Sequence, residues 1–250
     1  MRSDVALREA WERSHPFPIG SPFWIDESFR ASVERSETLR LASRYLPADL
    51  TSKIFGGQEE IGRLWSSYRD HGYGYLFYAL ARVLRPKRCV EIGVLHGFSL
   101  LTVAAALRDN DFGTVTGFDL FESYAYRHGR HAEVQDSIAV LGLGRWAMAV
   151  QAEAESISQR FDEVDYLHVD ISNDGQILGW MFDEWAPKVT QIMIFEGGAP
   201  ERDRVPWMID YNRVPIVEAL DERRRRQTDW QIVVPRPCPS VTLAIRLNQS

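Results

Sequence analysis

The stretch VEIGVLHG at residues 90–97, followed by VTGFD at residues 115–119, decides the fold of this chain. Residues 88–92 are predicted to form a short apolar strand, residues 93–97 a glycine turn, and residues 99–108 a helix rich in Leu and Ala. A second strand then ends in Asp119. This order makes one βαβ unit, and open parallel sheets bind their ligands at the carboxyl ends of such strands.

The glycine turn lacks the spacing of a dinucleotide site. Such a site has three glycines in the pattern G-x-G-x-x-G, which closes on a pyrophosphate at the start of the helix. This chain instead has Glu91, Gly93 and Gly97. A carboxylate in the turn would repel a phosphate, because two negative groups would share one cleft. We therefore expect a ligand that carries a cation near this turn.

These residues resemble the first motif of the class I S-adenosylmethionine-dependent methyltransferases, written E/D-x-G-x-x-x-G, and Asp119 matches the acid that ends the second strand in that family. The resemblance implies that S-adenosyl-L-methionine is the cofactor. It places Glu91 near the methionine end, Asp119 on both ribose hydroxyls and Glu153 on the adenine amino group. The residues assigned to the cofactor in this way are Glu91, Gly93, Gly97, Ser99, Asp119, Glu153 and Asp170. The alternative for Glu91 is an ordinary acid at a strand end.

The rest of the chain continues the alternation of helices and strands. Helices are predicted at residues 125–141, 153–160 and 174–185, and strands at residues 145–151, 164–170 and 191–195. Two final strands, at residues 230–234 and 241–247, are separated by a proline-rich segment and are expected to form a hairpin. The methyltransferase resemblance implies an α/β fold, a doubly wound, Rossmann-like sheet of seven strands with the last one antiparallel.

The first eighty residues fall outside this repeat. Helices with apolar faces are predicted at residues 27–45, 58–68 and 74–84. We therefore expect an N-terminal helical cap or lid over residues 1–80 and a methyltransferase domain over residues 81–250. The aromatic residues of DHGYGY at residues 70–75 could close over the adenosine as a mobile lid. Packing of the cap on the sheet is the alternative.

Methyl transfer needs alignment, exclusion of water, and removal of a proton when the acceptor is a hydroxyl. His168 and Asp170 stand at the end of the fourth predicted strand and point to the same side, because side chains alternate along a strand. We predict that both are catalytic, with His168 as the general base, since an imidazole titrates near neutral pH. A histidine in a buried strand is also commonly a hydrogen-bonded core residue, and that interpretation stays open.

Asp170 and Glu196 also resemble metal ligands. In the metal-dependent O-methyltransferases of the catechol type and in the macrolide-sugar methyltransferases, acids after the fourth and fifth strands hold magnesium. Here Gly197 stands where a further oxygen ligand is expected, so the set is incomplete unless Asn173 or Asp174 completes it. Because Mg²⁺ retains several waters, a magnesium ion at Asp170 and Glu196 stays an alternative.

Composition limits the class of protein. The chain has 250 residues, of which 45% are hydrophobic and 26% are charged, as in a globular domain with one full core. Its net charge of -6 argues against a nucleic-acid partner. The two cysteines, Cys89 and Cys238, are far apart, so we expect neither a zinc cluster nor a disulfide framework and favour a cytoplasmic location. No apolar run approaches the roughly 18 residues of a membrane helix, so no membrane partner is expected.

The methyltransferase resemblance therefore implies an S-adenosylmethionine-dependent methyltransferase that acts on a small-molecule acceptor, at oxygen and in secondary metabolism. Arginines in residues 201–211 are expected to rim the acceptor pocket and would suit an anionic acceptor. Two alternatives use the same cofactor: a cyclase or lyase that releases methylthioadenosine, and a catalytically silent binding protein. Association into a homo-oligomer stays open.

Overall fold

The computed structural model describes residue 38 and residues 66–247, except residues 71, 236, 237 and 239. The cap expected over residues 1–80 lies largely outside the described residues. Of the helices expected at residues 27–45 and 58–68, the structure describes only residue 38 and residues 66–68. The third expected helix is present as α7, Gly74–Leu84. It runs across the expected boundary between residues 80 and 81.

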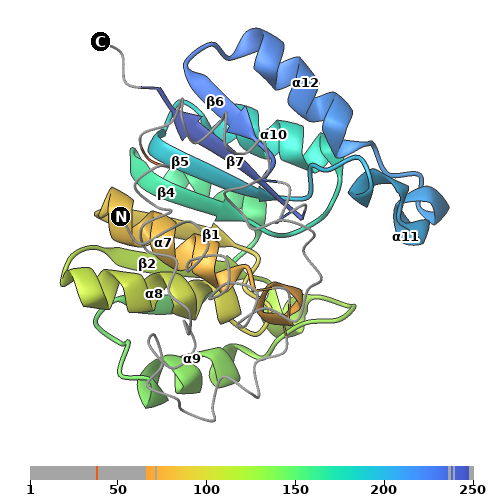
Figure 1. Cartoon of the computed structure of the whole chain (residues 1–250). Helices are drawn as coiled ribbons and strands as arrows, with labels where there is room; N and C mark the ends of the chain where they lie inside the picture. The colour runs from red at the N-terminus through yellow and green to blue at the C-terminus, as the bar shows by residue number, and fades with distance from the viewer. Residues whose placement is uncertain (1–37, 39–65, 71, 236–237, 239, 248–250) are drawn as a thin grey trace, which may run out of the picture.

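A single sheet of seven strands forms the centre of the fold (Figure 1). The strands are β1 Arg88–Ile92, β2 Thr114–Asp119, β3 Ala147–Gln151, β4 Val164–Val169, β5 Val189–Glu196, β6 Trp230–Val233 and β7 Val241–Arg246. Their order is β3-β2-β1-β4-β5-β7-β6, with β1 to β5 parallel and β7 antiparallel to both β5 and β6. The predicted seven-stranded doubly wound sheet and its final hairpin are confirmed. The direction of winding reverses between β1 and β4, where sheets of this kind bind ligands.

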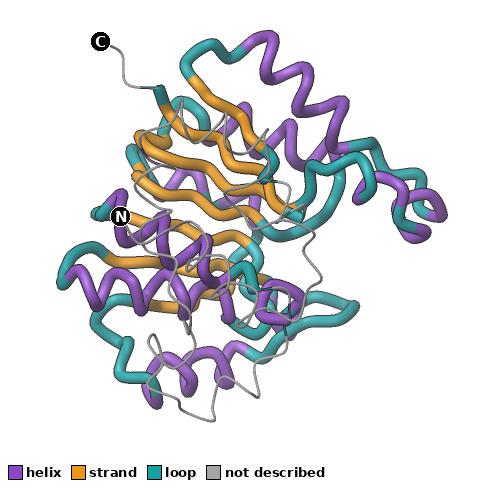
Figure 2. Tube along the Cα trace, viewed as in Figure 1, coloured by secondary structure: helices purple, strands orange, loops and turns teal. Residues whose placement is uncertain are grey.

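Helices cover both faces of the sheet (Figure 2). One face packs against α7, α8 and α9, and the other against α10 and α12. Their bounds are α8 Phe98–Asn110, α9 His131–Val140, α10 Gly175–Trp185 and α12 Ile216–Arg226. Two short helices, α6 Ser67–Asp70 and α11 Pro206–Asp210, stand at the ends of loops. Among the described residues, no helix combines the length and the apolar character that crossing a bilayer requires.

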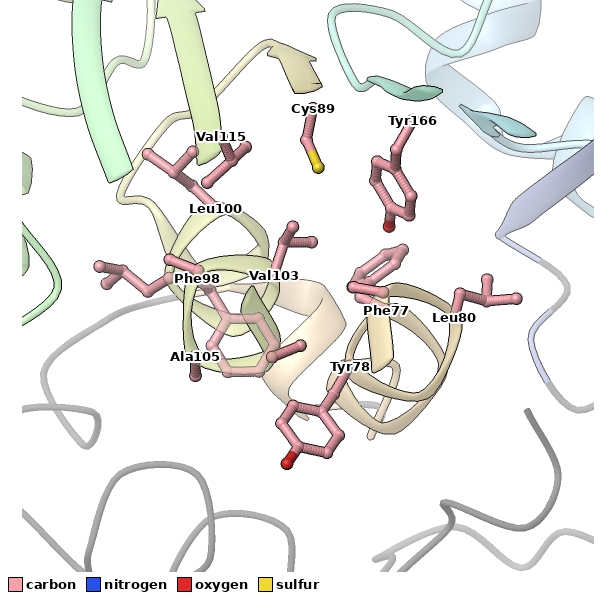
Figure 3. Packing of buried hydrophobic residues seen from close by; sticks show 14 of the residues in the cluster. Phe77, Tyr78, Leu80, Cys89, Phe98, Leu100, Val103, Ala105, Val115 and Tyr166 are labelled. Atoms are coloured by element: carbon pink, nitrogen blue, oxygen red, sulfur yellow. The ribbon is translucent and has the colours of Figure 1, made fainter. Parts of the chain in front are cut away.

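The core beneath α7 and α8 fixes the first βαβ unit (Figure 3). Cys89, Val115 and Tyr166 point from the strands toward the two helices and are almost fully buried. Leu100 and Val103 meet them from α8. The helix α8 buries nearly its whole surface, because its middle turn consists of alanines that let α7 approach closely. The helix that follows the glycine turn is thereby held between the sheet and α7.

Two predicted helices differ from the structure. The helix expected at residues 125–141 begins only at His131. Before it, the chain crosses the glycine turn so closely that a Cβ at Gly129 would lie 1.7 Å from the carbonyl oxygen of Leu95. Tyr126 is 76% exposed there, so this segment has no apolar face to bury as a helix. The helix expected at residues 153–160 is two short 3₁₀ helices, η3 Ala154–Ser156 and η4 Ser158–Arg160.

Candidate active site

A cavity of about 690 Å³ opens where β1, β2, β4 and β5 end. Among the described residues, five carboxylates line it, and of the described lining side chains only Arg127 and His128 can balance their charge. The five acids are Asp119, Glu153, Glu155, Asp170 and Glu196. Apolar and aromatic side chains, Leu95, Ile177, Tyr124 and Trp180 among them, form much of the remaining wall. The cavity therefore suits a ligand with an apolar or aromatic part and hydrogen-bond donors or positive charge.

Gly93 shapes the floor of this cavity. Its φ of +92° lies in the left-handed region, and a Cβ there would be 2.1 Å from the carbonyl oxygen of Asp170. The amide of Asp170 in turn donates to the carbonyl of Ile92 at 2.8 Å, which ties the end of β4 to the end of β1. The glycine is required because two strand ends meet here with no room for a side chain.

Asp119, at the end of β2, binds the backbone of the glycine turn that follows β1. One carboxylate oxygen, Oδ2, accepts from the amides of Val94 and Leu95 at 2.7 and 2.9 Å. The other, Oδ1, accepts from the amide of Phe121 at 2.7 Å. Leu95 and Phe121 have φ values of 50° and 47°, which residues other than glycine rarely adopt. Because a carboxylate has about four acceptor positions, three bonds to the backbone leave about one for a ligand.

Three of the residues assigned to the cofactor do not line the cavity. Glu91 is 1% exposed and lies on the face of β1 that α8 covers, while its neighbours Ile92 and Gly93 line the cavity. The hydroxyl of Ser99, at the start of α8, donates to Glu91 Oε1 at 2.8 Å. Gly97 begins α8 with a φ of +88°. In contrast, Gly93, Asp119, Glu153 and Asp170 do lie on the cavity wall.

His168 is also buried away from the cavity. Its side chain is 0% exposed, and its ring packs against Phe77 and Tyr68 with centroid distances of 4.9 and 5.8 Å. Its Nδ1 lies 3.3 Å from Glu91 Oε2. Burial by itself lowers the pKa of His168, but the carboxylates of Glu91 and Asp170 outweigh that effect and raise it. A side chain in this position cannot touch an acceptor in the cavity, so direct general-base catalysis by His168 is not supported by its position.

Asp170 and Glu196 form a pair of half-buried acids at one end of the cavity. Burial raises the pKa of Asp170 well above its usual range, and the charge and hydrogen bond of Glu196 raise it further, whereas His168 lowers it. Burial also raises the pKa of Glu196, against the opposing effects of its hydrogen bond to Asp170 and the charge of Arg202. Because burial raises the pKa of both neighbouring carboxyl groups, this end of the cavity favours a bound proton more than an exposed carboxylate does.

The donor set does not fit a magnesium site. Asp174 is occupied as the N-cap of α10, where it accepts from the amide of Gln176 at 2.8 Å and pairs with Arg213 at 3.2 Å. Asn173 is 1% exposed and does not line the cavity. Within the described part of the chain, no group of three or more His, Cys, Asp or Glu side chains is placed to hold a metal ion. Neither Asn173 nor Asp174 therefore completes the ligand set of Asp170 and Glu196, as the sequence left possible.

Sequence reasoning missed part of the cavity wall. Arg127 lines it from the segment at residues 125–141 that was predicted to be helical, Tyr124 lines it from just before that segment, and Trp180 lines it from α10. Their signal was weak, because nothing in the local sequence shows that this loop folds back over the glycine turn. Conversely, none of residues 201–211 lines the cavity. Asp203 instead accepts from the amides of Ile216 and Val217 and so caps the start of α12.

Comparisons with known proteins agree with this architecture. A family model described as "Methyltransferase domain" matches residues 90–192. A search of curated protein sequences found no significant match. The family model confirms the methyltransferase resemblance expected from the glycine turn over the residues that it matches.

Solved structures of similar fold are numerous. The O-methyltransferase from Bacillus cereus in complex with SAH is 14% identical, with a TM-score of 0.56, over 86% of this chain and 100% of that one. The O-methyltransferase TomG from Streptomyces achromogenes, involved in tomaymycin synthesis and solved with SAM, is 19% identical, with a TM-score of 0.52, over 86% and 98%. The SAH-bound methyltransferase PaMTH1 from Podospora anserina is 15% identical, with a TM-score of 0.53, over 90% and 97%. These likenesses confirm the class I methyltransferase fold.

Proposed function

We propose that this chain, in which residues 90–192 match a methyltransferase domain, transfers the methyl group of S-adenosylmethionine to a hydroxyl oxygen of a small molecule. The observation that carries the proposal is the cavity at the carboxyl ends of the parallel strands, with Asp119 and Glu153 lining it and the Asp170 and Glu196 pair at one end. This is the edge at which doubly wound sheets bind ligands. The O-methyltransferases of similar fold support the choice of oxygen as the acceptor atom.

The residues on the cavity wall fit this cofactor. Gly93 leaves room for a ligand at the turn, and Asp119 keeps about one acceptor position for a ribose hydroxyl. Glu153 is exposed and lines the same cavity as Tyr124 and Trp180, so the wall offers an acceptor for the adenine amino group and two aromatic side chains. When bound, S-adenosylmethionine supplies a methyl group on a positively charged sulfur. The acidic wall of the cavity favours that charge.

The acid pair is the proton acceptor in this proposal. A lone pair on the acceptor oxygen attacks the methyl carbon while the carbon–sulfur bond breaks and its electrons stay on sulfur. The hydroxyl proton passes to the pair Asp170 and Glu196, whose raised pKa values favour binding a proton there. Asp170 keeps the catalytic role predicted from the sequence, and Glu196 joins it as a proton acceptor rather than as a metal ligand.

The charge of the cavity also bears on the acceptor. In the part of the chain that the structure describes, five lining carboxylates against one arginine and one histidine disfavour an anionic acceptor. The arginines that suggested such an acceptor lie on residues 201–211, outside the cavity wall, and Arg202 acts on Glu196. We therefore propose a neutral or cationic hydroxyl compound in place of an anionic one.

The proposal places the enzyme in the cytoplasm and its product in secondary metabolism. Both described cysteines are buried and free, which suits a reducing compartment. The neighbour involved in tomaymycin synthesis supports the second point.

The groups named above belong to one chain, so the proposed chemistry requires no second copy. Residues 1–80 are proposed as a cap over this edge of the sheet.

The reaction is tested by mass spectrometry of the cofactor products. The purified protein is incubated with S-adenosylmethionine and a set of neutral, cationic and anionic hydroxyl compounds. Methyl transfer yields S-adenosylhomocysteine and an acceptor heavier by one methyl group. Release of methylthioadenosine would establish the cyclase or lyase alternative, and binding without either product across the set would favour the silent binding protein.

A further inference from the structure

Asp119, at the end of β2, has too few free acceptor positions for a whole ribose. Its carboxylate accepts from three backbone amides, those of Val94, Leu95 and Phe121, which leaves about one position. The ribose of S-adenosylmethionine has two hydroxyl groups, and each has a hydrogen to donate. A hydroxyl that leaves water without finding a partner in the cavity weakens binding. A second acceptor near Asp119 would satisfy the other hydroxyl.

The segment at residues 121–131, called the strap below, leaves Asp119 and returns close to it. It begins at Phe121, whose amide donates to Asp119 Oδ1. It comes back at Gly129, which approaches the carbonyl oxygen of Leu95 so closely that no side chain would fit between them. The amide of Leu95 donates in turn to Asp119 Oδ2. Both ends of the strap are thereby placed beside the same carboxylate.

His128 stands one residue before this return, and its half-buried side chain lines the cavity. Its Nδ1 lies 2.7 Å from the carbonyl oxygen of Tyr126. Because a carbonyl oxygen can only accept, Nδ1 must carry a hydrogen and donate it. In the neutral ring the remaining lone pair is then on Nε2, which has no hydrogen-bond partner among the described residues. The contact with Tyr126 therefore fixes the tautomer and makes Nε2 an acceptor.

Other groups on the β2 side of the cavity wall suit this role less well. The carbonyl of Leu120 already accepts two hydrogen bonds, at 2.8 and 3.0 Å. Arg127 has only hydrogens to donate. The phenolic oxygen of Tyr124 is a weaker acceptor than an imidazole nitrogen, because its lone pairs are delocalised into the ring. The remaining carboxylates of the wall stand after other strands, β3, β4 and β5.

We propose that His128 Nε2 accepts a hydrogen bond from one ribose hydroxyl of the cofactor while Asp119 accepts from the other. This inference rests on the proposed function and extends it, since it divides between two residues a role that the methyltransferase resemblance assigned to Asp119 alone. Because a backbone carbonyl holds Nδ1, the ring is oriented before the cofactor binds, which reduces the entropy that binding costs.

The test measures binding and needs no turnover. Calorimetry gives the Kd values of S-adenosylhomocysteine and of its 2′-deoxy and 3′-deoxy analogues for the wild type and for His128→Ala. Loss of one hydrogen bond should weaken S-adenosylhomocysteine binding about fivefold to tenfold in the variant. One deoxy analogue lacks the hydroxyl that His128 binds, so its Kd should differ by less than about twofold between the two proteins. The other analogue should show the full loss.

Two further variants guard against a change in the strap itself. His128→Phe keeps a ring and removes both nitrogens, so it should repeat the pattern of His128→Ala even if the alanine disturbs the fold. Tyr126→Phe is the matched control, because the Tyr126 side chain is largely exposed, lies outside the cavity wall and keeps its carbonyl for His128. It should bind all three ligands within about twofold of the wild type.

An equal loss for S-adenosylhomocysteine and both analogues, or no loss in either His128 variant, would overturn the inference. A comparable loss in Tyr126→Phe would overturn it too, because the effect would then come from the strap and not from Nε2. A wild type that binds none of the three ligands would overturn the proposed function together with the inference. The expected binding pattern without methyl transfer would support the inference and count against the proposed transfer alone.

Discussion

Replacing Asp119 by alanine should damage the fold as well as any ligand site. The carboxylate accepts from three backbone amides, those of Val94, Leu95 and Phe121, at 2.7 to 2.9 Å. Leu95 and Phe121 are held in the left-handed region, where an L side chain costs about 1 kcal/mol or more. Asp119→Ala removes the group that holds both of these conformations.

The magnitude follows from these bonds. A hydrogen bond to a charged group contributes about 1.5 to 3 kcal/mol, so three such bonds give an upper range of about 4.5 to 9 kcal/mol. Asp119 is only half-buried, and water can replace part of this contribution. We expect Asp119→Ala to lower the free energy of unfolding by about 3 kcal/mol, which corresponds to a fall in Tm of about 6 to 12 °C for a chain of this size.

The assay is urea unfolding followed by circular dichroism without any ligand. Asp136→Ala is the control, because Asp136 is exposed on α9 and its loss should cost less than about 0.5 kcal/mol. Asp119→Asn should lie between the two, since it keeps one acceptor oxygen. If Asp119→Ala lowered the free energy of unfolding by less than about 1 kcal/mol and changed only the affinity for S-adenosylmethionine, Asp119 would not have this structural role.

Three further predictions concern other parts of the molecule. Gly93→Ala should lower both stability and kcat, measured by thermal unfolding and by S-adenosylhomocysteine formation, because the new Cβ would displace the backbone of Asp170; a fully active, stable variant would contradict the close contact. Burial raises the pKa of Tyr78 to about 12, and the hydrogen bond and charge of Asp109 raise it too. The unfolded state ionises first, so this contribution to stability is present below pH 10 and is lost as the pH rises toward about 12. Tyr78→Phe should therefore show a shallower loss of unfolding free energy than the wild type over that window, and parallel curves would refute the shift. Dialysis against EDTA should leave turnover unchanged, because the described donor set provides only two carboxylates; activity lost with EDTA and restored by magnesium would return Asp170 and Glu196 to the role of metal ligands.

Much of the fold could be predicted because the strands carry continuous apolar runs and the turns carry glycine. The strand at residues 88–92 and the helix at residues 74–84 were predicted with their observed bounds. The helix at residues 125–141 was not, because its shortening depends on a tertiary contact. The close approach of Gly129 to Leu95 stands against the earlier start, and no local pattern reports a contact between residues so far apart.

The site was predictable to a similar degree. Acids at strand ends could be placed at the sheet edge, and Asp119, Asp170 and Glu196 do meet at one cavity. What the sequence could not give is the face to which Glu91 and His168 point relative to that cavity. His168 and Asp170 were expected to point to the same side, but the strand ends at Val169, and Asp170 lines the cavity while His168 packs against Phe77 of α7. A shift at the strand end thus separates a cavity residue from a core residue.

The central claim is that S-adenosylmethionine binds in the cavity beside Asp119 with its methyl group toward Asp170 and Glu196. The most direct measurement is a crystal structure of the protein with this compound and an active acceptor analogue. The account predicts the ribose within hydrogen-bond distance of Asp119, the adenine near Glu153, and the sulfur closer to Asp170 than to Glu91. Density for the cofactor outside this cavity would contradict the account. A methionine end in direct contact with the Glu91 carboxylate would contradict it too.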